Sequence, residues 1–339
     1  MKWGNSDKKR FTREDIPDLS GRTALVTGGT KGIGYETVRA LALAHARVLI
    51  LARSTELGQK AVTTIKQESS SADVEFIQCD LADLAMVKQV ADKICKDEAR
   101  MDIVIANAAI GLLPFGLTKD GIDRHFAINH LGHYLLINRL LPLLRRTARL
   151  SPAPSPGPRI VTLTSNVHRS APASTAFAAP AEVCADAGLS AMALYARSKL
   201  AVALFAKFGL AERVFTQPRD RDRGISAVTL HPGIVHTDQL DQLKDAYGLV
   251  VGSVLKYLTL PLAQRPAQGC LSVVWAATAA EVDRNGWSGR YLDGVGQLAE
   301  PSKLAQDPEL GRNLWVLSEQ LVKEKLGPDA LLPWDVGSE

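Results

Sequence analysis

The chain has 339 residues, with 40 Lys and Arg against 36 Asp and Glu and a net charge of +4. This even balance, with no long basic block, argues against a nucleic-acid-binding protein. Hydrophobic residues make up 46% and charged residues 22%, which is typical of a soluble globular protein with a sizeable core. No apolar run approaches the ~20 residues of a membrane-spanning helix, so we expect no transmembrane segment.

The cysteines and histidines of the chain are scattered. The four cysteines, Cys79, Cys95, Cys184 and Cys270, lack the paired spacing of a zinc site or a disulfide framework. They therefore predict reduced thiols and a cytoplasmic protein. His130 and His133 lie three residues apart, but no third ligand is spaced to complete a site, so we expect no bound metal.

Short β-branched runs alternate with longer amphipathic stretches along the chain. Strands are expected at residues 23–29, 47–53, 74–80, 101–109, 159–165, 224–233 and, late in the chain, 289–294. Helices are expected at residues 35–46, 55–68, 81–95 and 122–147 and around Tyr195. This alternation, with nearly all-apolar strands, predicts a single α/β domain whose doubly wound parallel sheet carries helices on both faces.

Several segments interrupt this rhythm without dividing the domain. We expect residues 1–19 to be a polar N-terminal extension, residues 20–326 to be the domain, and residues 327–339 to be a C-terminal tail. Within the domain, the Pro-rich stretch at residues 151–158 predicts a surface loop, and residues 216–224 predict a charged connector. Because strand-like segments resume after both, neither marks a domain boundary.

The first predicted strand runs into the glycine-rich sequence TGGTKGIG at residues 27–34, which opens directly into a helix. Glycines 28, 32 and 34 permit a tight turn and a close approach of the backbone to a phosphate. The helix N-terminus adds free N–H groups and a positive dipole end. Because Lys31 precedes Gly32, the sequence lacks the order of a Walker A loop. The turn therefore predicts a Rossmann-type dinucleotide site.

The end of the second predicted strand bears on which dinucleotide binds. An acid at this place bonds the ribose 2′-hydroxyl of NAD, whereas Arg accommodates the 2′-phosphate of NADP. Here the strand ends in Ala52 and Arg53 with no acid, and Lys31 is a second cation. We therefore expect NADP(H). The alternative is that Arg53 is only a solvated cation at a strand end.

Tyr195 and Lys199 are four residues apart in a predicted helix, so they share one face. They could be an unremarkable surface pair. Alternatively, Tyr195 transfers a proton to or from a substrate oxygen, which suits a carbonyl that accepts hydride. A nearby ammonium and an oxidised nicotinamide would both favour phenolate and lower the pKa of Tyr195 from its usual value near ~10.

Motifs along the chain resemble the short-chain dehydrogenases/reductases from about residue 20 to residue 295. They are TGGTKGIG, CDL at 79–81, ANAA at 106–109, INHLGHY with Asn129, TLTS ending at Ser165, YARSK at 195–199 and HPGIVHT at 231–237. Within that family the chain is most similar to the retinol dehydrogenase and WW-domain oxidoreductase group and its fungal relatives. The features shared with this group are His168, the long insertion before Tyr195, and the C-terminal segments.

The resemblance implies a catalytic tetrad of Asn129, Ser165, Tyr195 and Lys199, with Ser165 and Tyr195 also contacting the substrate. Asp80 and Leu81 would meet the adenine, and Val235 and Thr237 the nicotinamide amide. The cofactor contacts that we expect are Gly28, Thr30, Lys31, Gly32, Ile33, Gly34, Arg53, Asp80, Leu81, Asn107, Ala108, Tyr195, Lys199, Pro232, Gly233, Val235 and Thr237. Residues 106–109 depart from the family pattern, because they read Ala-Asn-Ala-Ala where Asn-Asn-Ala-Gly is usual.

Residues 236–262 follow the carboxyl end of a predicted strand and are rich in apolar side chains at helical spacing. We expect this segment to be a substrate lid, with Tyr247 and Val251 contacting the substrate. The alternative is a helix packed on the core. Residues 247–262 also leave open attachment to a membrane surface or a lipid droplet.

The expected function is an NADP(H)-dependent oxidoreductase that interconverts a ketone or aldehyde with its alcohol. We expect it to act as a reductase of a lipophilic or secondary-metabolite carbonyl, a small-molecule substrate. One alternative is a non-catalytic dinucleotide-binding sensor. Another is a retinoid- or steroid-type dehydrogenase at a membrane or lipid droplet. The sequence also leaves open a homo-oligomer.

Overall fold

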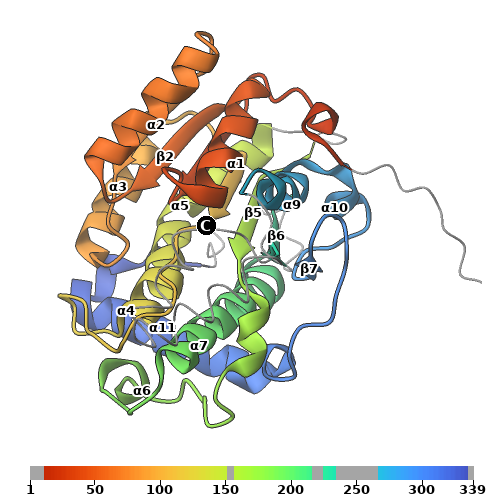
Figure 1. Ribbon diagram of the computed structural model, residues 1–339. Coiled ribbons are helices and arrows are strands. Elements are labelled where there is room, and N and C mark those ends of the chain that lie inside the picture. The colour runs from red at the N-terminus through yellow and green to blue at the C-terminus, as the bar shows by residue number, and fades with distance from the viewer. Residues whose placement is uncertain (1–10, 151–155, 216–223, 234–265, 335–339) are drawn as a thin grey trace, which may run out of the picture.

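The computed structural model describes residues 11–150, 156–215, 224–233 and 266–334 (Figure 1). In these ranges seven strands form one sheet, in the order β3-β2-β1-β4-β5-β6-β7. They are β1 (Thr23–Thr27), β2 (Arg47–Ala52), β3 (Val74–Gln78), β4 (Ile103–Ala106), β5 (Arg159–Leu163), β6 (Ser226–His231) and β7 (Tyr291–Asp293). All neighbouring strands are parallel, and the strand order reverses between β1 and β4. The predicted doubly wound α/β fold is confirmed.

Helices cover both faces of the sheet (Figure 1). One face carries α1 (Gly32–Leu43), α2 (Thr55–Glu68), α9 (Pro266–Thr278) and α10 (Ala280–Arg284). The other carries α3 (Leu84–Asp97), α5 (Gly132–Leu150), α7 (Ala191–Leu204) with its π-helical continuation η4 (Phe205–Val214), and α11 (Pro308–Leu326). Successive strand residues point to opposite faces: Leu25 packs under α3 and α5, while Val26 packs under α1 and α9.

Short helical segments connect these elements. They are η1 (Arg13–Asp15), α4 (Arg124–Phe126), η2 (Ala127–Leu131), η3 (Asn166–Ser170), α6 (Ala181–Cys184), η7 (Leu304–Gln306) and η8 (Pro328–Ala330). Because η2 is π-helical and runs from α4 directly into α5, the three form one continuous element. The single helix expected at residues 122–147 thus contains a π turn, a feature often found at functional sites.

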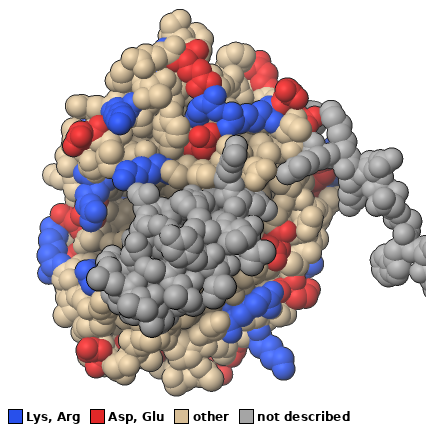
Figure 2. Space-filling view, viewed as in Figure 1, with Lys and Arg blue, Asp and Glu red and all other residues tan. Residues whose placement is uncertain are grey.

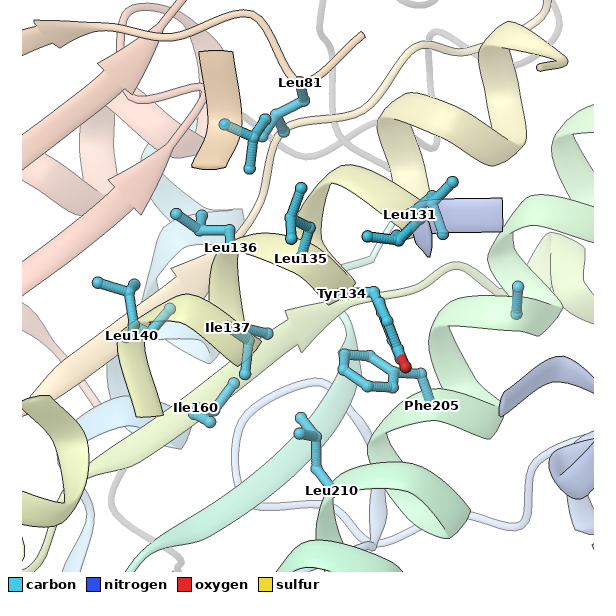
Figure 3. Packing of buried hydrophobic residues seen from close by; sticks show 14 of the residues in the cluster. Leu81, Leu131, Tyr134, Leu135, Leu136, Ile137, Leu140, Ile160, Phe205 and Leu210 are labelled. Carbon is cyan, nitrogen blue, oxygen red and sulfur yellow. The ribbon is translucent and has the colours of Figure 1, made fainter. Parts of the chain in front are cut away.

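The core on the α5 face contains a cluster of aromatic rings. Figure 3 shows Ile137 pointing toward Ile160 of the sheet and Tyr134 lying against Phe205. Trp315 of α11 and Trp334 complete the cluster, with their ring centroids 4.7 Å apart. Residues 327–334 therefore pack on α5, and the Trp334 indole donates a hydrogen bond to the Tyr134 hydroxyl at 3.2 Å.

The helices α9 and α11 lie outside the helices expected from the sequence. A signal for α11 was present: Leu310, Leu314, Leu317 and Leu321 recur three or four residues apart and are all buried. Asp307 adds an N-cap, since its carboxylate accepts from the Glu309 and Leu310 amides.

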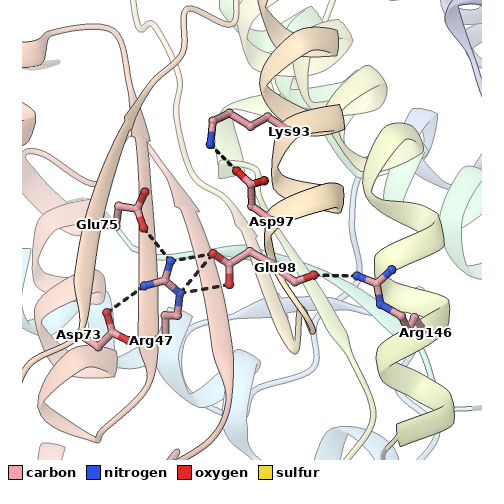
Figure 4. Close-up of polar contacts among 7 residues, drawn as sticks. All are labelled: Arg47, Asp73, Glu75, Lys93, Asp97, Glu98 and Arg146. Atoms are coloured by element: carbon pink, nitrogen blue, oxygen red, sulfur yellow. Dashed lines mark hydrogen bonds and ion pairs between the residues drawn. The ribbon is translucent and has the colours of Figure 1, made fainter.

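Charged side chains form networks at the edge of the sheet where the strands begin, which we call the amino edge. Figure 4 shows the Arg47 guanidinium, at the start of β2, contacting the carboxylates of Asp73, Glu75 and Glu98 at 2.9, 2.6 and 2.7 Å. At the start of β5, Arg159 is almost fully buried and reaches the Asp283 carboxylate at 2.5 Å. These contacts join strands and helices that are distant in the sequence.

Arg159 has further partners within the described residues. Its guanidinium donates to the carbonyls of Ala276, in the last turn of α9, and of Ala279, just after it, and to the Ser226 hydroxyl. The amino edge therefore surrounds its buried cation with acceptors.

Elsewhere, basic and acidic side chains are interspersed on the face drawn in Figure 2. No helix in the described ranges is long and apolar enough to cross a bilayer. No group of three His, Cys, Asp or Glu side chains in these ranges could hold a metal ion. The expected lid at 236–262 and most of the loop at 151–158 lie outside the described residues.

Candidate active site

Neighbouring strands deliver the expected site residues to the opposite edge of the sheet, which we call the carboxyl edge. Ligands of open parallel α/β sheets bind at this edge, at the point where the strand order reverses. The residues follow the strands in this way: Arg53 after β2, Asp80 and Leu81 after β3, residues 28–34 after β1, Asn107 and Ala108 after β4, Ser165 after β5, and Pro232 and Gly233 after β6.

The turn after β1 requires its glycines. Gly28 has a φ of +67°, and a Cβ added there would lie 3.0 Å from the Cα of Ala108. A Cβ on Gly34 would collide with the Gly28 carbonyl oxygen and would lie 2.5 Å from Asn107 Nδ2. The helix α1 begins at Gly32, and the preceding Lys31 provides no side-chain cap. Small residues around an uncapped helix N-terminus form a cradle that fits a pyrophosphate.

Thr27 and Asn107 lock this turn to the end of β4. The Asn107 amide side chain donates to the Thr27 carbonyl at 2.8 Å. The backbone N–H groups of Asn107 and Ala108 donate to the Thr27 hydroxyl at 3.0 and 2.9 Å. Ala108, which agrees with the family pattern, also faces this turn, since a Cβ added to Gly28 would lie 3.1 Å from its methyl carbon.

Tyr195 and Lys199 lie on the same face of α7, as their spacing predicts. The Lys199 Nζ is 5.7 Å from the centroid of the Tyr195 ring. It donates to the Leu163 carbonyl of β5 at 2.9 Å, and Lys199 is only 4% exposed. Burial lowers the pKa of Lys199 from 10.5 to about 8. Neutral pH is therefore close to the pH at which the Lys199 ammonium loses its proton.

The pKa of Tyr195 differs from our expectation. Burial raises the pKa of Tyr195 to about 12, opposed by a hydrogen bond with Ser165. We expected the lysine and an oxidised cofactor to lower it. In the protein alone that expectation is wrong, because the loss of hydration at the phenol outweighs the favourable interactions. Tyr195 is consequently protonated at neutral pH.

Ser165 is held at the start of η3 by the Val167 amide and by the His168 ring. Its hydroxyl accepts from the Val167 amide at 3.3 Å, which caps η3. Its carbonyl contacts the His168 Nδ1 at 2.6 Å, while the Ser302 amide donates to the His168 Nε2 at 2.9 Å. Because Nε2 accepts, the proton is on Nδ1 and the imidazole is neutral. This contact gives His168 a physical role that the sequence did not reveal.

Asn129 lies in the π turn η2 and joins the loop after β4 to α7. Its Oδ1 accepts from the Ile110 amide at 2.9 Å, and its Nδ2 donates to the Ile110 carbonyl at 3.1 Å. The same Nδ2 donates to the Ser198 hydroxyl at 2.9 Å, which donates to the Tyr195 carbonyl at 2.7 Å. Sequence reasoning did not single out Ser198, which lies within the YARSK motif. Since both N–H groups of the Asn129 amide bind protein atoms, this side chain fixes α7.

Three further expected cofactor contacts follow β2 and β3. Arg53 is exposed, and its carbonyl accepts from the Gln78 amide at 3.2 Å. The Asp80 carboxylate accepts from the Ala82 amide at 2.9 Å. Leu81 is buried beside Gly132, on which a Cβ would come 2.7 Å from the Leu81 carbonyl oxygen.

Four expected site residues cannot be placed in this arrangement. Val235, Thr237, Tyr247 and Val251 lie outside the described residues.

Comparisons with known proteins agree with this arrangement. Residues 22–179 match the short chain dehydrogenase family. The chain is 34% identical to the oxidoreductase bli-4 of Neurospora crassa, over 95% of this chain and 76% of that protein. It is 33% identical to the polyprenol dehydrogenase of Danio rerio, over 93% and 90% of the two chains. It is 31% identical to the WW domain-containing oxidoreductase of Danio rerio, over 93% and 72%.

These similarities cover more than nine-tenths of this chain. The parallel sheet, the glycine cradle at its carboxyl edge and the Tyr195–Lys199 pair on α7 are consistent with them. The chain belongs to the short-chain dehydrogenase/reductase family of oxidoreductases, and it is related to the WW domain-containing oxidoreductases, the polyprenol dehydrogenases and fungal oxidoreductases.

Proposed function

We propose that the protein is an NADP(H)-dependent oxidoreductase that interconverts a ketone or aldehyde with its alcohol and acts as a reductase. One observation carries this proposal. Tyr195 lies within hydrogen-bonding reach of Ser165 and beside the Lys199 ammonium, at the same sheet edge as the glycine cradle. A sensor that only binds a dinucleotide has no need for these three groups to be adjacent.

Each residue has a defined task in the reduction. A bound reduced nicotinamide supplies the hydride that adds to the carbonyl carbon. Tyr195 donates its phenolic proton to the carbonyl oxygen, so that the alcohol gains one hydride and one proton. The Ser165 hydroxyl donates a hydrogen bond that holds the same oxygen. The Lys199 ammonium stabilises the phenolate that remains. With its pKa raised to about 12, Tyr195 carries its proton at neutral pH, as the donor to the carbonyl oxygen must.

The choice of NADP(H) rests on the cations beside the cradle. Arg53 is exposed just after β2, where NAD-binding members of this fold usually carry an acid. Lys31 immediately precedes α1. Both are suited to a 2′-phosphate, which binds guanidinium and ammonium groups through charge-assisted hydrogen bonds.

The proposed substrate is a lipophilic carbonyl, such as a terpenoid or secondary metabolite. One relative is named polyprenol dehydrogenase, and a polyprenol is a long apolar alcohol. We propose that residues 236–262 form the lid over this substrate, with Tyr247 and Val251 in contact with it. The same relative favours a second candidate, a dehydrogenase that works at a membrane or lipid-droplet surface. Flotation of the purified protein with lipid vesicles tests this second candidate.

The direct test is a screen of ketones and aldehydes with the purified protein, following the loss of NADPH absorbance. The proposal expects substrate-dependent NADPH oxidation, with a weaker rate from NADH. Tight NADPH binding without turnover of any carbonyl or alcohol would instead favour the sensor.

The substitution Arg53→Asp tests the cofactor preference. It removes a cation and places a carboxylate where the 2′-phosphate is expected. The NADPH/NADH ratio of kcat/KM should fall by about 100-fold, which corresponds to one charge-assisted contact. Arg284→Asp is the matched control, because Arg284 is also exposed but lies on α10, near the amino edge. An unchanged ratio in Arg53→Asp would make Arg53 a surface cation and Lys31 the next residue to test.

We also propose a cytoplasmic location, with residues 20–326 as the catalytic domain. The Neurospora relative is named as mitochondrial, so cell fractionation is the deciding experiment. Light scattering of the purified protein tests for a homo-oligomer.

A further inference from the structure

His133 connects the two halves of the candidate site. It lies in α5, one turn after Asn129, and is 3% exposed. Its Nδ1 is 3.2 Å from the Asn129 carbonyl oxygen, and its Nε2 is 2.8 Å from the Thr27 hydroxyl. Nδ1 therefore contacts the π turn η2, and Nε2 contacts Thr27, the residue just before the glycines of the turn.

The hydrogen bonds determine where the imidazole proton lies. The Asn129 carbonyl can only accept, so the proton is on Nδ1. The Thr27 hydroxyl already accepts two amide N–H groups, from Asn107 and Ala108, so its own proton is free to go to Nε2. The Ile105 carbonyl is a more distant alternative acceptor for that proton, at 3.4 Å. One neutral tautomer thus satisfies every partner.

The electrostatic surroundings agree with a neutral ring. Burial, and secondarily the charge of Lys199, lower the pKa of His133 to about 4, against the opposing effect of the Asn129 carbonyl. A protonated His133 would place a donor against Thr27 and a second positive charge near Lys199.

These contacts form a chain that passes through Asn129. Hydrogen bonds run from the amides after β4 through Thr27 and His133 to the main-chain carbonyl of Asn129. The side-chain amide of Asn129 continues the chain to Ser198 and the Tyr195 carbonyl. The glycine turn would hold the cofactor, and α7 carries the proton donor. Their separation determines how closely the nicotinamide can approach the substrate oxygen, and small errors in such distances are costly in rate.

We propose that His133 is a positioning residue, a neutral imidazole protonated on Nδ1 that fixes the dinucleotide turn relative to the helix of Tyr195. This inference rests on the proposed function for its catalytic consequences, but the hydrogen-bond chain can be tested without turnover.

His130 provides a matched control within the same helical segment. It is 1% exposed, and burial lowers its pKa to about 3. Its Nε2 contacts the Ser318 hydroxyl of α11 at 2.8 Å, among the rings of Tyr134 and Phe205. Substituting His130 should therefore cost stability as substituting His133 does, but it leaves the chain from Thr27 to Tyr195 intact.

Two substitutions separate the two contacts of His133. In His133→Asn, the side-chain amide can donate from the Nδ1 position to the Asn129 carbonyl, but it cannot reach Thr27. In His133→Gln, the amide oxygen can accept from Thr27 at the Nε2 position, but the donor to Asn129 is lost. NADPH binding is measured by fluorescence, and turnover by reduction of 4-nitrobenzaldehyde or, failing that, of the best carbonyl in the screen.

The two variants should fail in different ways. For His133→Gln we expect kcat to fall by about 10- to 100-fold with the NADPH Kd nearly unchanged, because the helix of Tyr195 is displaced. For His133→Asn we expect the NADPH Kd to rise about tenfold, because the turn that would hold the cofactor is loosened. His130→Asn and His130→Gln should lower Tm but leave kcat and Kd close to wild type. If the His133 variants behave like these controls, His133 is only a core residue and the proposal is overturned.

A readout without turnover separates this inference from the proposed function. Nitrogen-15 NMR of the histidine rings should show His133 protonated on Nδ1 alone. Hydrogen exchange of the Asn107 and Ala108 amides should speed up in His133→Asn and not in His133→Gln. An Nε2-protonated ring, or equal exchange in both variants, would overturn the inference even if the enzyme is active. A wild type that shows these signatures but reduces no carbonyl would instead overturn the proposed function.

Discussion

Arg159 and Lys199 are both buried cations, but they lie at opposite edges of the sheet and have different partners. At the amino edge, Arg159 meets the Asp283 carboxylate, the Ser226 hydroxyl and two carbonyls at and just after the end of α9. At the carboxyl edge, Lys199 is nearly as buried, yet the partner described for its ammonium is the single Leu163 carbonyl. The first cation is electrostatically compensated, and the second is held ready to lose its proton.

The comparison shows that one edge of the sheet carries a buried cation that stabilises the fold, while the other carries one that is suited to catalysis. A buried cation with an anionic partner stabilises the folded state relative to the same cation alone. A buried cation with only a neutral acceptor has a lowered pKa, about 8 for Lys199, and its charge can act on a neighbouring group. Three substitutions test this separation.

Tyr195→Phe tests the carboxyl edge and carries the largest expected effect. It removes the proton donor and keeps the ring, so turnover should fall by about 10²- to 10⁴-fold with NADPH binding largely retained. Tyr134→Phe is the control, since it removes a hydroxyl that contacts Trp334 in the aromatic cluster of the core. That variant should lose some stability and keep its turnover. Wild-type turnover in Tyr195→Phe would refute the assignment of the proton donor.

Asp283→Ala tests the amino edge. It leaves the Arg159 guanidinium buried without its carboxylate, and the free energy of unfolding should fall by up to about 3 kcal/mol. The loss is at the lower end for such pairs, because the Asp283 side chain is 32% exposed. Denaturant unfolding measures the loss, while kcat and KM should stay unchanged. Asp97→Ala, which breaks the exposed pair with Lys93, should show no measurable change. A comparable loss of activity in Asp283→Ala would mean that the two edges are coupled.

Lys199→Met should lower turnover and yet stabilise the fold. A pKa lowered from 10.5 to about 8 means that the folded state binds this proton less readily than the unfolded state. The cost is therefore fully present below pH 8 and disappears as the pH rises to the unfolded value. After allowing for the lost hydrogen bond to Leu163, we expect a gain of about 1–2 kcal/mol at neutral pH. The gain should vanish above about pH 10. A less stable variant at neutral pH would show that the ammonium is better compensated than its contacts indicate.

Most of the fold could be predicted from the sequence because strands buried on both faces are almost continuously apolar. The glycine turn and the spacing of Tyr195 and Lys199 were also readable, since both depend on local geometry. The contact between Thr27 and His133 was not, because it joins residues 106 positions apart and depends on how α5 lies on the sheet. The pKa direction of Tyr195 was misjudged for a related reason. Sequence spacing reveals a neighbouring charge, but it does not reveal how completely water is removed.

The packing of residues 327–334 on α5 has a consequence for how the chain is made. The hydrogen bond between Trp334 and Tyr134 spans 200 positions, and the one between Leu332 and Asn138 spans 194. On the ribosome, α5 emerges long before the segment that covers its aromatic rings. The nascent chain must therefore expose the aromatic surface of α5 until residues 327–334 have been made and can cover it.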